Sequence, residues 1–510
     1  MRNSNTLRTL VCALLALVAV VLTLPAAANA GSRQLSMMQD DAEMFGERPG
    51  EDPAAAMREM KELGVDVLRT NVLFYRIYDD FTDRRRPANF DPSDPNSPQY
   101  TRWGPTDNIV RLARQNGIKL LFTVSGPGPH WASDQPGRCR GRNLCPWRPN
   151  VKVFGQFVEA VAKRYRGQVD WYSIYNEPNI GRSSGGTGWL MPQASRTRAG
   201  RVETAGVIYR KLWQAGYRAI AKHDRARRGR VLFGEVAAIG EPLPKLYAAL
   251  CLDRTGKPFR GALRRAHDCG RVSKLRIGGW AIHPYNQGGF GPPNRTTNSK
   301  TALPQQYLPR LHRLMRQAAA RGRVSGGKGI YITEFGYQTN PPDRISTITP
   351  KLHARYINES DRLFFGDPRV KTVSQYQLVD VNDVSQYNSG LRFAGGTKRK
   401  KASYDAYRIP IVVTRRSSSL VEVYGQVRPA RQARLANVFS APQLQFAPRG
   451  RGFTTIRRPR LNSVGIFRMN IRRGGAAAGR WRIRWNNGLI GGVSYSRVAK
   501  AGKPLRYYRD

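Results

Sequence analysis

The sequence is poor in acidic residues, histidine and cysteine, and beyond residue 24 it has no long hydrophobic run. Among 510 residues, 35 are Asp or Glu against 85 Lys or Arg, six are His and five are Cys. No His/Asp constellation of metal-binding spacing is present, so we expect neither a metal nor a cofactor. No later segment is long and apolar enough to cross a bilayer. The hydrophobic fraction of 40% nevertheless excludes a disordered chain.

Residues 1–30 have the composition of a secretory signal peptide. Arg2 and Arg8 precede an apolar stretch from about Leu10 to Leu24, and a small-residue cleavage site ends at Ala30. We expect cleavage after Ala30 and a secreted, extracellular protein. The alternative is an uncleaved membrane anchor, which is disfavoured because the apolar run is shorter than the ~20 residues of a span.

One of the five cysteines leaves with the signal peptide, and an even number remains. In an exported chain this favours disulfides. We pair Cys139 with Cys145 and Cys251 with Cys269, because short local loops close most easily. Zinc binding is the weaker alternative, since the spacings are not Cys-x2-Cys and His267 is the only histidine near either pair.

The formal net charge is +50, and it becomes +48 without the two arginines of the signal peptide. Such a chain attracts anionic polymers in a salt-dependent way. The basic residues are scattered through every segment and form no recognisable module for reading nucleic acid, so no specific nucleic-acid partner is expected. A basic surface that faces an anionic cell-wall polymer or an acidic matrix is the favoured interpretation.

From about Arg33 to Ala406, short β-branched or aromatic runs alternate with helical periods, which indicates β/α units on a parallel sheet. Several helical periods end at glycine, such as Gly64, Gly117 and Gly167, which suits a left-handed cap. Eight alternations predict an α/β fold, a closed (β/α)8 TIM barrel over residues 31–408. The eight expected strands are Gln34 to Met38, Val65 to Leu73, Ile118 to Val124, Val169 to Tyr175, Arg230 to Ala237, Arg276 to His283, Ile330 to Glu334 and Thr372 to Leu378. The expected helices are Pro53 to Leu63, Thr106 to Asn116, Val151 to Tyr165, Glu203 to Lys222, Gln305 to Ala320 and Leu352 to Phe365.

The character of the sequence changes after Ala406. Residues 409–510 show no sustained helical period, but short alternating runs separated by Gly, Pro and Asn. This pattern predicts a small antiparallel β-sandwich domain after the barrel. Residues 411–510 hold 21 Lys and Arg against Glu422 and Asp510 alone, so this domain is strongly basic.

Two glutamates, Glu177 and Glu334, directly follow predicted strands, in Asn176-Glu177-Pro178 and Thr333-Glu334-Phe335-Gly336. Catalytic groups of such barrels lie at the C-terminal ends of strands. The strand count places Glu177 after the fourth strand and Glu334 after the seventh, which face each other across the barrel mouth. Two carboxylates about 5 to 5.5 Å apart can hydrolyse a glycosidic bond with retention. The alternatives are a solvated loop acid for Glu334 and a simple acid near a helix start for Glu177.

These motifs resemble those of the retaining clan A glycoside hydrolases, over residues 33 to about 406. The stretches Trp171 to Asn179 and Ile332 to Gly336 are most similar to families 39 and 5, which include cellulase-like and β-xylosidase-like enzymes. The resemblance implies that Glu177 is the acid/base and Glu334 the nucleophile. It also implies that Asn176 donates a hydrogen bond to the substrate 2-hydroxyl.

Three further residues at strand ends fit the same site. Arg69, near the end of the second strand, can hydrogen-bond Glu334 and keep it ionised. After the sixth strand, His283 and Tyr285 resemble the active-site His and Tyr of the clan, with Tyr285 placed to orient Glu334. The alternatives are a surface role for Arg69 and a turn around Pro284 that His283 merely fills.

Aromatic side chains are expected in the cleft, because sugar rings stack on them. Trp131, after the third strand, is the best candidate, and core packing is the alternative. On the eighth strand the family commonly presents a tryptophan, where this sequence has Gln375-Tyr376-Gln377. Tyr376 can substitute, but the departure leaves the identity of the bound sugar open.

Together the patterns predict a secreted retaining glycoside hydrolase that acts on a plant or microbial polysaccharide or oligosaccharide. A non-catalytic carbohydrate or cell-wall binding protein on the same barrel is the alternative from another class, and transglycosylation is the chemical variant. Glucan, xylan, galactan, mannan and uronic-acid polymers are all compatible with the sequence.

Overall fold

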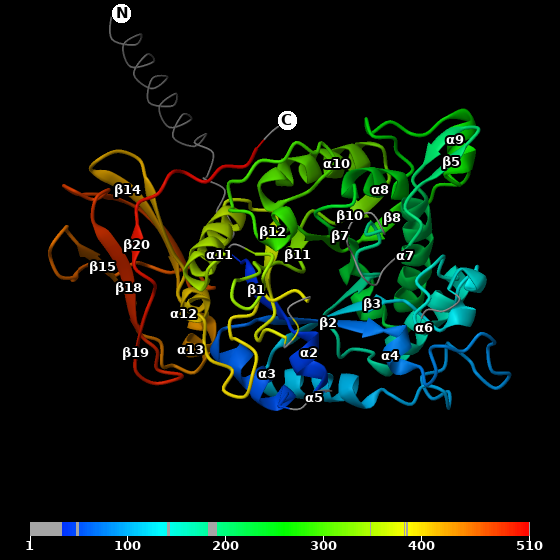
Figure 1. Ribbon diagram of the computed structural model, residues 1–510, viewed down its shortest axis with the longest axis horizontal. Helices are drawn as coiled ribbons and strands as arrows, with labels where there is room; N and C mark the ends of the chain where they lie inside the picture. Colours follow the sequence, from blue (N-terminus) through cyan, green and yellow to red (C-terminus); the bar gives the residue numbers. More distant parts are fainter. Residues whose placement is uncertain are drawn as a thin grey trace, which may run out of the picture.

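The computed structural model of the protein describes residues 33–46, 50–139, 143–181, 191–346, 348–381, 383 and 386–508 (Figure 1). The predicted signal peptide, residues 1–30, lies outside these ranges. Every helix in the described ranges is too short or too polar to cross a membrane.

Eight parallel strands close into a barrel, and each corresponds to a strand predicted from the sequence. Around the barrel they pair in the order β1-β12-β11-β9-β7-β4-β3-β2. Strands such as β2 and β7 are buried along their whole length, because the barrel interior covers one face and the helices cover the other. The strands are β1 (Leu35–Gln39), β2 (Val67–Leu73), β3 (Lys119–Ser125), β4 (Trp171–Ile174), β7 (Val231–Ala237), β9 (Gly279–His283), β11 (Ile330–Ile332) and β12 (Val370–Tyr376).

Helices follow the strands and cover the outside of the barrel (Figure 1). The side chain of Asp52 caps α3 by accepting from Ala54 N and Ala55 N. Gly117 ends α5 at a φ of 63°, the left-handed cap that its position predicted. The helices are α2 (Asp41–Phe45), α3 (Pro53–Glu62), α4 (Phe74–Ile77), α5 (Gly104–Asn116), α6 (Val151–Arg164), α7 (Thr204–His223), α8 (Pro242–Ala249), α9 (Gly261–Ala266), α10 (Leu308–Ala320), α11 (Pro350–Phe365), α12 (Ala402–Arg408) and α13 (Ala430–Leu435), with 3-10 turns at His130–Ala132, Pro136–Cys139, Arg225–Arg230, Gln287–Gly289 and Gln305–Tyr307.

Two antiparallel sheets follow the barrel and enclose a hydrophobic core of their own. One has three strands in the order β13-β14-β17, and the other joins β16-β15-β18-β19 with β20 beside β18. The fold is therefore a TIM barrel followed by an antiparallel β domain, as the sequence predicted. The short helix α13 was not expected, because six residues are too few to produce a helical period. The strands are β13 (Ile411–Arg415), β14 (Leu420–Gln426), β15 (Gln443–Ala447), β16 (Thr454–Arg457), β17 (Ile466–Arg472), β18 (Arg480–Asn486), β19 (Val493–Tyr495) and β20 (Ala499–Lys500).

An acidic residue of the sandwich joins it to the barrel. Glu422 on β14 is 3% exposed and pairs with Arg362 of α11 and with Arg416 and Arg468 of its own domain. Burial alone would raise the pKa of Glu422, but the three guanidinium groups outweigh it and lower that pKa to about 2. The carboxylate is therefore ionised at neutral pH.

The segment after the sandwich returns to the barrel, where the red end of the ribbon approaches α10 (Figure 1). Tyr507 donates its hydroxyl to the carbonyl of Leu363, at 2.8 Å. Tyr508 makes two hydrogen bonds to the loop between β9 and α10: its backbone N–H donates to Gln306 O at 2.8 Å, and its hydroxyl donates to Asn294 O at 3.0 Å. This segment thus holds the loop between β9 and α10.

Both predicted disulfides are present, Cys139–Cys145 and Cys251–Cys269. Two small sheets were not predicted, because three-residue strands give no readable period. They are the hairpin of β5 (Ser195–Thr197) with β6 (Gly200–Val202), and the parallel pair of β8 (Leu275–Ile277) with β10 (Val324–Gly326).

Candidate active site

Glu177 lies three residues beyond β4, in a backbone that turns sharply away from the strand. Its φ is 45°, in the left-handed region that non-glycine residues rarely adopt. A backbone bond holds this conformation, since Glu177 N donates to Glu235 O at 2.9 Å. The turn directs the carboxylate to the barrel axis, where Oε1 lies 2.8 Å from Nδ1 of His283.

Glu334 follows β11 by two residues. In β11 itself, Tyr331 packs against the cluster inside the barrel, whereas Ile330 and Ile332 belong to the core between the barrel and the helices, so Glu334 does not continue an inward face of the two isoleucines. Tyr285 donates its hydroxyl to Oε1 of Glu334 at 2.9 Å, and Arg69 Nη1 donates to Oε2 at 3.0 Å. The side chain of Glu334 is 13% exposed, so it reaches the mouth of the barrel without being freely solvated.

The two carboxylates lie close together. The ligand atoms of Glu177, His283 and Glu334 are all within 4.8 Å of one another. Burial raises the pKa of Glu334, and the charge of Glu177 raises it further, while His283, Arg69 and the Tyr285 hydroxyl oppose the shift. Two ionised carboxylates without neighbouring donors would repel each other in this site. His283, Arg69 and the Tyr285 hydroxyl therefore decide how far Glu334 is stabilised in its ionised form.

Arg69 connects most of the site. Nη2 donates to Asn176 Oδ1 at 2.7 Å and to Glu235 Oε2 at 2.6 Å, and Nη1 donates to Gln39 Oε1 as well as to Glu334. The side chain is completely buried. The expectation that Arg69 lies near the end of its strand is wrong, because it is the third of seven residues of β2, which continues through polar Thr70 and Asn71 to Leu73.

Asn176 is oriented by this contact. Its Oδ1 accepts from Arg69, and its backbone N–H donates to Ser125 Oγ at 3.0 Å. The amide is thus fixed with Nδ2 as its remaining side-chain donor, the group that a bound hydroxyl would need.

Glu235 is a third buried carboxylate, which the sequence analysis missed. It lies on β7 at a bulge between Gly234 and Val236, with a φ of 48°. Burial would raise the pKa of Glu235, but Arg69 and His283 outweigh it and lower that pKa to about 2. A glycine beside a glutamate inside an apolar run is the signal that could have revealed it, because glycine in a strand often marks a bulge. Gln39 at the end of β1 was missed for lack of any motif.

His283, the last residue of β9, bridges two carboxylates. Nδ1 lies 2.8 Å from Glu177 Oε1 and Nε2 lies 2.9 Å from Glu235 Oε2, and the side chain is completely buried. Burial would lower the pKa of His283, but the three surrounding carboxylates outweigh it and raise that pKa to about 9. At neutral pH the ring is therefore an imidazolium that donates from both nitrogens.

The same geometry bears on metal binding, because Glu177, His283 and Glu334 are close enough to share an ion. A histidine binds a metal through a neutral ring nitrogen with a free lone pair. Both nitrogens of His283 instead face carboxylates and carry protons at neutral pH. Both nitrogens of His283 are thus already engaged by carboxylates.

Tyr376 is the last residue of β12 and is part of an aromatic group. Its ring centroid lies 5.8 Å from that of Tyr387, which in turn lies 5.0 Å from that of Tyr285. The side chain of Gln375 is bound within the protein: its Nε2 donates to the carbonyls of Tyr376, Gln377 and Ser389 and fixes the following loop. The three tyrosines form a continuous aromatic wall beside Glu334.

Trp131 lies in the turn after β3 and is partly buried. Its ring makes edge contacts with Phe74, Tyr78 and Phe90, at centroid distances of 6.3, 5.9 and 5.7 Å. The structure thus places Trp131 in an aromatic cluster that supports the loops after β2 and β3, whereas the other predicted site residues converge on the carboxylates.

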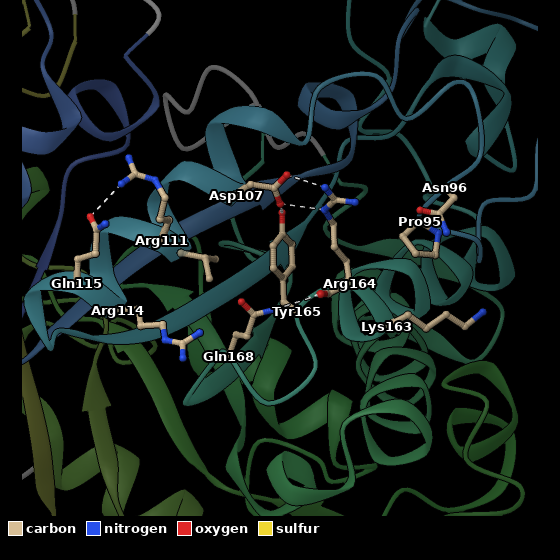
Figure 2. A pocket seen from close by; sticks show the side chains of 11 residues that line it. Pro95, Asn96, Asp107, Arg111, Arg114, Gln115, Lys163, Arg164, Tyr165 and Gln168 are labelled. Carbon is tan, nitrogen blue, oxygen red and sulfur yellow. Dashed lines mark hydrogen bonds and ion pairs between the residues drawn. The ribbon is translucent and has the colours of Figure 1, made fainter.

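A hollow of about 750 Å³ lies elsewhere, between α5 and the end of α6 (Figure 2). Figure 2 shows Arg111 and Arg114 on one side and Lys163 and Arg164 on the other. Asp107 in this lining is bound by Arg164 and by the Tyr165 hydroxyl. These helix ends lead into β3 and β4, so the hollow is at the opposite end of the barrel from the carboxylates.

No protein-family model and no curated protein matches the sequence. Among solved structures, the chain is similar to a family 39 glycoside hydrolase from Bacteroides cellulosilyticus WH2 at 15% identity, covering 87% of this chain and 81% of that one, with a TM-score of 0.47. It is similar to a glucosidase from Croceicoccus marinus at 12% identity, with the same coverage and TM-score. It is also similar to a β-glycosidase from Thermosphaera aggregans at 16% identity, covering 69% and 83% of the two chains, with a TM-score of 0.43. The fold assignment itself rests on the strand pairing described above.

Proposed function

We propose that the protein is a secreted retaining glycoside hydrolase that cleaves O-glycosidic bonds of a polysaccharide or oligosaccharide. The observation that carries the proposal is the pair Glu177 and Glu334, with carboxylate oxygens within 4.8 Å at the mouth of the barrel. Retaining enzymes hold their carboxyl groups about 5–5.5 Å apart, whereas inverting enzymes separate them by about 6.5–9.5 Å to admit water.

In the first step, an oxygen of Glu334 attacks the anomeric carbon and forms an ester, while the glycosidic C–O bond breaks. Glu177 gives its proton to the departing oxygen. Arg69 and Tyr285 support the attack, because they orient Glu334 and stabilise its ionised form until the ester forms. Asn176 Nδ2 is available to the hydroxyl next to the anomeric carbon.

In the second step, water attacks the anomeric carbon and the ester bond to Glu334 breaks. Glu177 now accepts the proton of the water, and both carboxyl groups return to their initial states. While Glu334 is held in the ester it carries no negative charge, so no like charge lies beside the Glu177 carboxylate when it accepts the proton of the water. His283 stays bonded to Glu177 and helps to stabilise that ionised form.

The test begins with a panel of activated aryl glycosides and polysaccharides, to find a substrate of the wild type. With that substrate, Glu334→Ala should lose activity by about 10⁴-fold or more, and azide should restore cleavage with a glycosyl azide of inverted configuration. Glu177→Ala with azide should give the azide of retained configuration. Glu62→Gln, at an exposed position of α3, is the matched control and should keep wild-type activity. Wild-type cleavage by Glu334→Ala would contradict the assignment.

We also propose that the sandwich binds an anionic polymer of the cell surroundings. The outward face of β18 carries Arg480, Arg482 and Arg484, which alternate with buried Trp481, Ile483 and Trp485. Arg482 lies over the rings of Phe453 and Tyr495, at 4.1 and 4.4 Å. Within the described residues the domain's acidic side chain, Glu422, is already held by three arginines, so no carboxylate opposes this face.

The full-length protein should be retained on anionic cell-wall material at low salt and released at high salt. Arg482→Gln with Arg484→Gln should weaken retention more than the control pair Arg111→Gln with Arg114→Gln in the hollow of Figure 2. Equal effects of the two pairs would show that net charge acts without a specific face.

A further inference from the structure

A hollow of about 570 Å³ adjoins the carboxylate cluster. Tyr285 belongs to both, because its side chain lines the hollow while its hydroxyl donates to Glu334 at 2.9 Å. Other walls come from Ala238 and Ile239, directly after β7, and from the loop between β9 and α10. The hollow therefore opens on the catalytic face of the barrel, one aromatic ring away from the proposed nucleophile.

Two buried carbonyl oxygens in the lining have no hydrogen-bond donor in the described part of the chain: Asn286 Oδ1 and Gln306 Oε1. Both side chains are 1% exposed. The Asn286 amide is fixed, since its Nδ2 donates to Pro292 O at 2.7 Å. Buried acceptors are almost always paired in folded proteins, so these two oxygens call for donors from outside the described chain, such as water or the hydroxyl groups of a ligand. Sugar hydroxyls are such donors.

The charged group of the hollow is Arg295, an exposed residue whose guanidinium forms no ion pair or hydrogen bond with the described residues. From Cys269 to Thr333 the sequence has no Asp or Glu, so this loop supplies no carboxylate to neutralise it. The preceding carbonyl, Asn294 O, accepts from the Tyr508 hydroxyl, which positions the loop. A guanidinium fork is the group best suited to bind a carboxylate in two-point contact.

We propose that this hollow is the subsite for a sugar unit that bears a carboxylate, a hexuronic acid, next to the unit whose bond is cleaved. Arg295 binds the carboxylate, and Asn286 and Gln306 accept from its hydroxyl groups. The volume is within the ~300–1,000 Å³ of small-molecule sites. The inference rests on the proposed glycosidase function and defines its substrate class as uronate-containing glycans.

The test measures binding, so that it does not depend on turnover. Full-length Glu334→Gln protein is titrated by calorimetry with oligogalacturonides, oligoalginates and glucuronoxylan oligosaccharides, each also in a form with its carboxyl groups reduced to alcohols. At least one acidic probe should bind about tenfold more tightly than its reduced form. Arg295→Gln should remove this preference, and Arg321→Gln, an exposed arginine of the same acid-free segment, should keep it.

The absence of any preference for the acidic forms, or a preference that survives Arg295→Gln, overturns the inference. Sulfated neutral oligosaccharides that bind as tightly as the acidic probes overturn the assignment to a carboxylate. Arg295-dependent binding by a protein that forms no glycosyl azide would refute the proposed hydrolase and keep the subsite. Cleavage of neutral glycans without any preference for carboxylates would support the proposed hydrolase and refute the subsite.

Discussion

Nε2 of His283 lies 2.9 Å from Oε2 of Glu235, and both side chains are completely buried at the centre of the barrel. The pair is an imidazolium and a carboxylate, with His283 raised in pKa to about 9 and Glu235 lowered to about 2. Glu235 does not face the barrel mouth. It acts through His283 and Arg69, the two cations that contact Glu177 and Glu334, and is therefore a positioning residue.

Replacing Glu235 with Gln should keep the shape of the site and remove the central negative charge. His283 and Arg69 would lose a buried partner, so the free energy of unfolding should fall by about 3 kcal/mol in urea titrations. The pKa of His283, followed by NMR, should fall from about 9 toward its usual value of 6.5. Glu62→Gln on the exposed face of α3 should change neither quantity. An unchanged His283 pKa would contradict the positioning role.

The buried pair should make stability depend on pH at both ends. His283 is raised in pKa, so its contribution is fully present below pH 6.5 and is lost as pH rises through about 9. Glu235 is lowered in pKa, so its contribution is present above pH 4.5 and is lost as pH falls through about 2. The difference in unfolding free energy between wild type and Glu235→Gln should therefore be largest between pH 4.5 and 6.5. A difference that stays flat to about pH 9.5 would contradict the pairing.

Arg69→Met should destabilise the barrel by about 3–5 kcal/mol, because it leaves Glu235 buried with one cation fewer. Arg69→Lys keeps the charge but loses the fork that reaches Glu235, Asn176 and Glu334 together. We expect Lys to recover more stability than activity, as measured by urea unfolding and by kcat on the substrate found for the wild type. Full activity of the Lys variant would show that only the charge matters.

Tyr285→Phe removes one donor to Glu334 and keeps the ring. Because that hydroxyl lowers the pKa of Glu334, its loss should move the acidic limb of the pH–kcat profile to higher pH. A hydrogen bond to a charged group is worth about 1.5–3 kcal/mol, so kcat should fall about 10- to 100-fold with little change in KM. Tyr387→Phe is the matched control, since the Tyr387 hydroxyl is buried and unpaired within the described ranges. A KM effect without a kcat effect would assign Tyr285 to substrate binding alone.

The two catalytic candidates could be predicted because each follows a strand that is readable from its apolar residues. Counting strands then gave their relative positions, and the structure brings Glu177, Glu334, Arg69, Asn176, His283 and Tyr285 together. The count succeeded because β/α alternation leaves a period that a single sequence displays.

Glu235 and Gln39 could not be predicted in the same way, because no motif surrounds them. The role of a polar residue within a buried strand depends on its contacts with other strands. Only the closed barrel shows that β1, β2 and β7 direct Gln39, Arg69 and Glu235 to one point. Trp131 shows the converse, since an aromatic residue at a strand end is as useful to the packing of loops as to a cleft.

The contact of Tyr508 with Asn294 and Gln306 makes the barrel's binding surface depend on what comes after the sandwich. The loop that carries Arg295 is held by the C-terminal segment, which follows the two antiparallel sheets in the chain. The barrel and the sandwich are therefore not independent domains that can be exchanged without changing the barrel loop. A hybrid protein that joins this barrel to a different C-terminal domain would lose part of the scaffold that shapes its specificity.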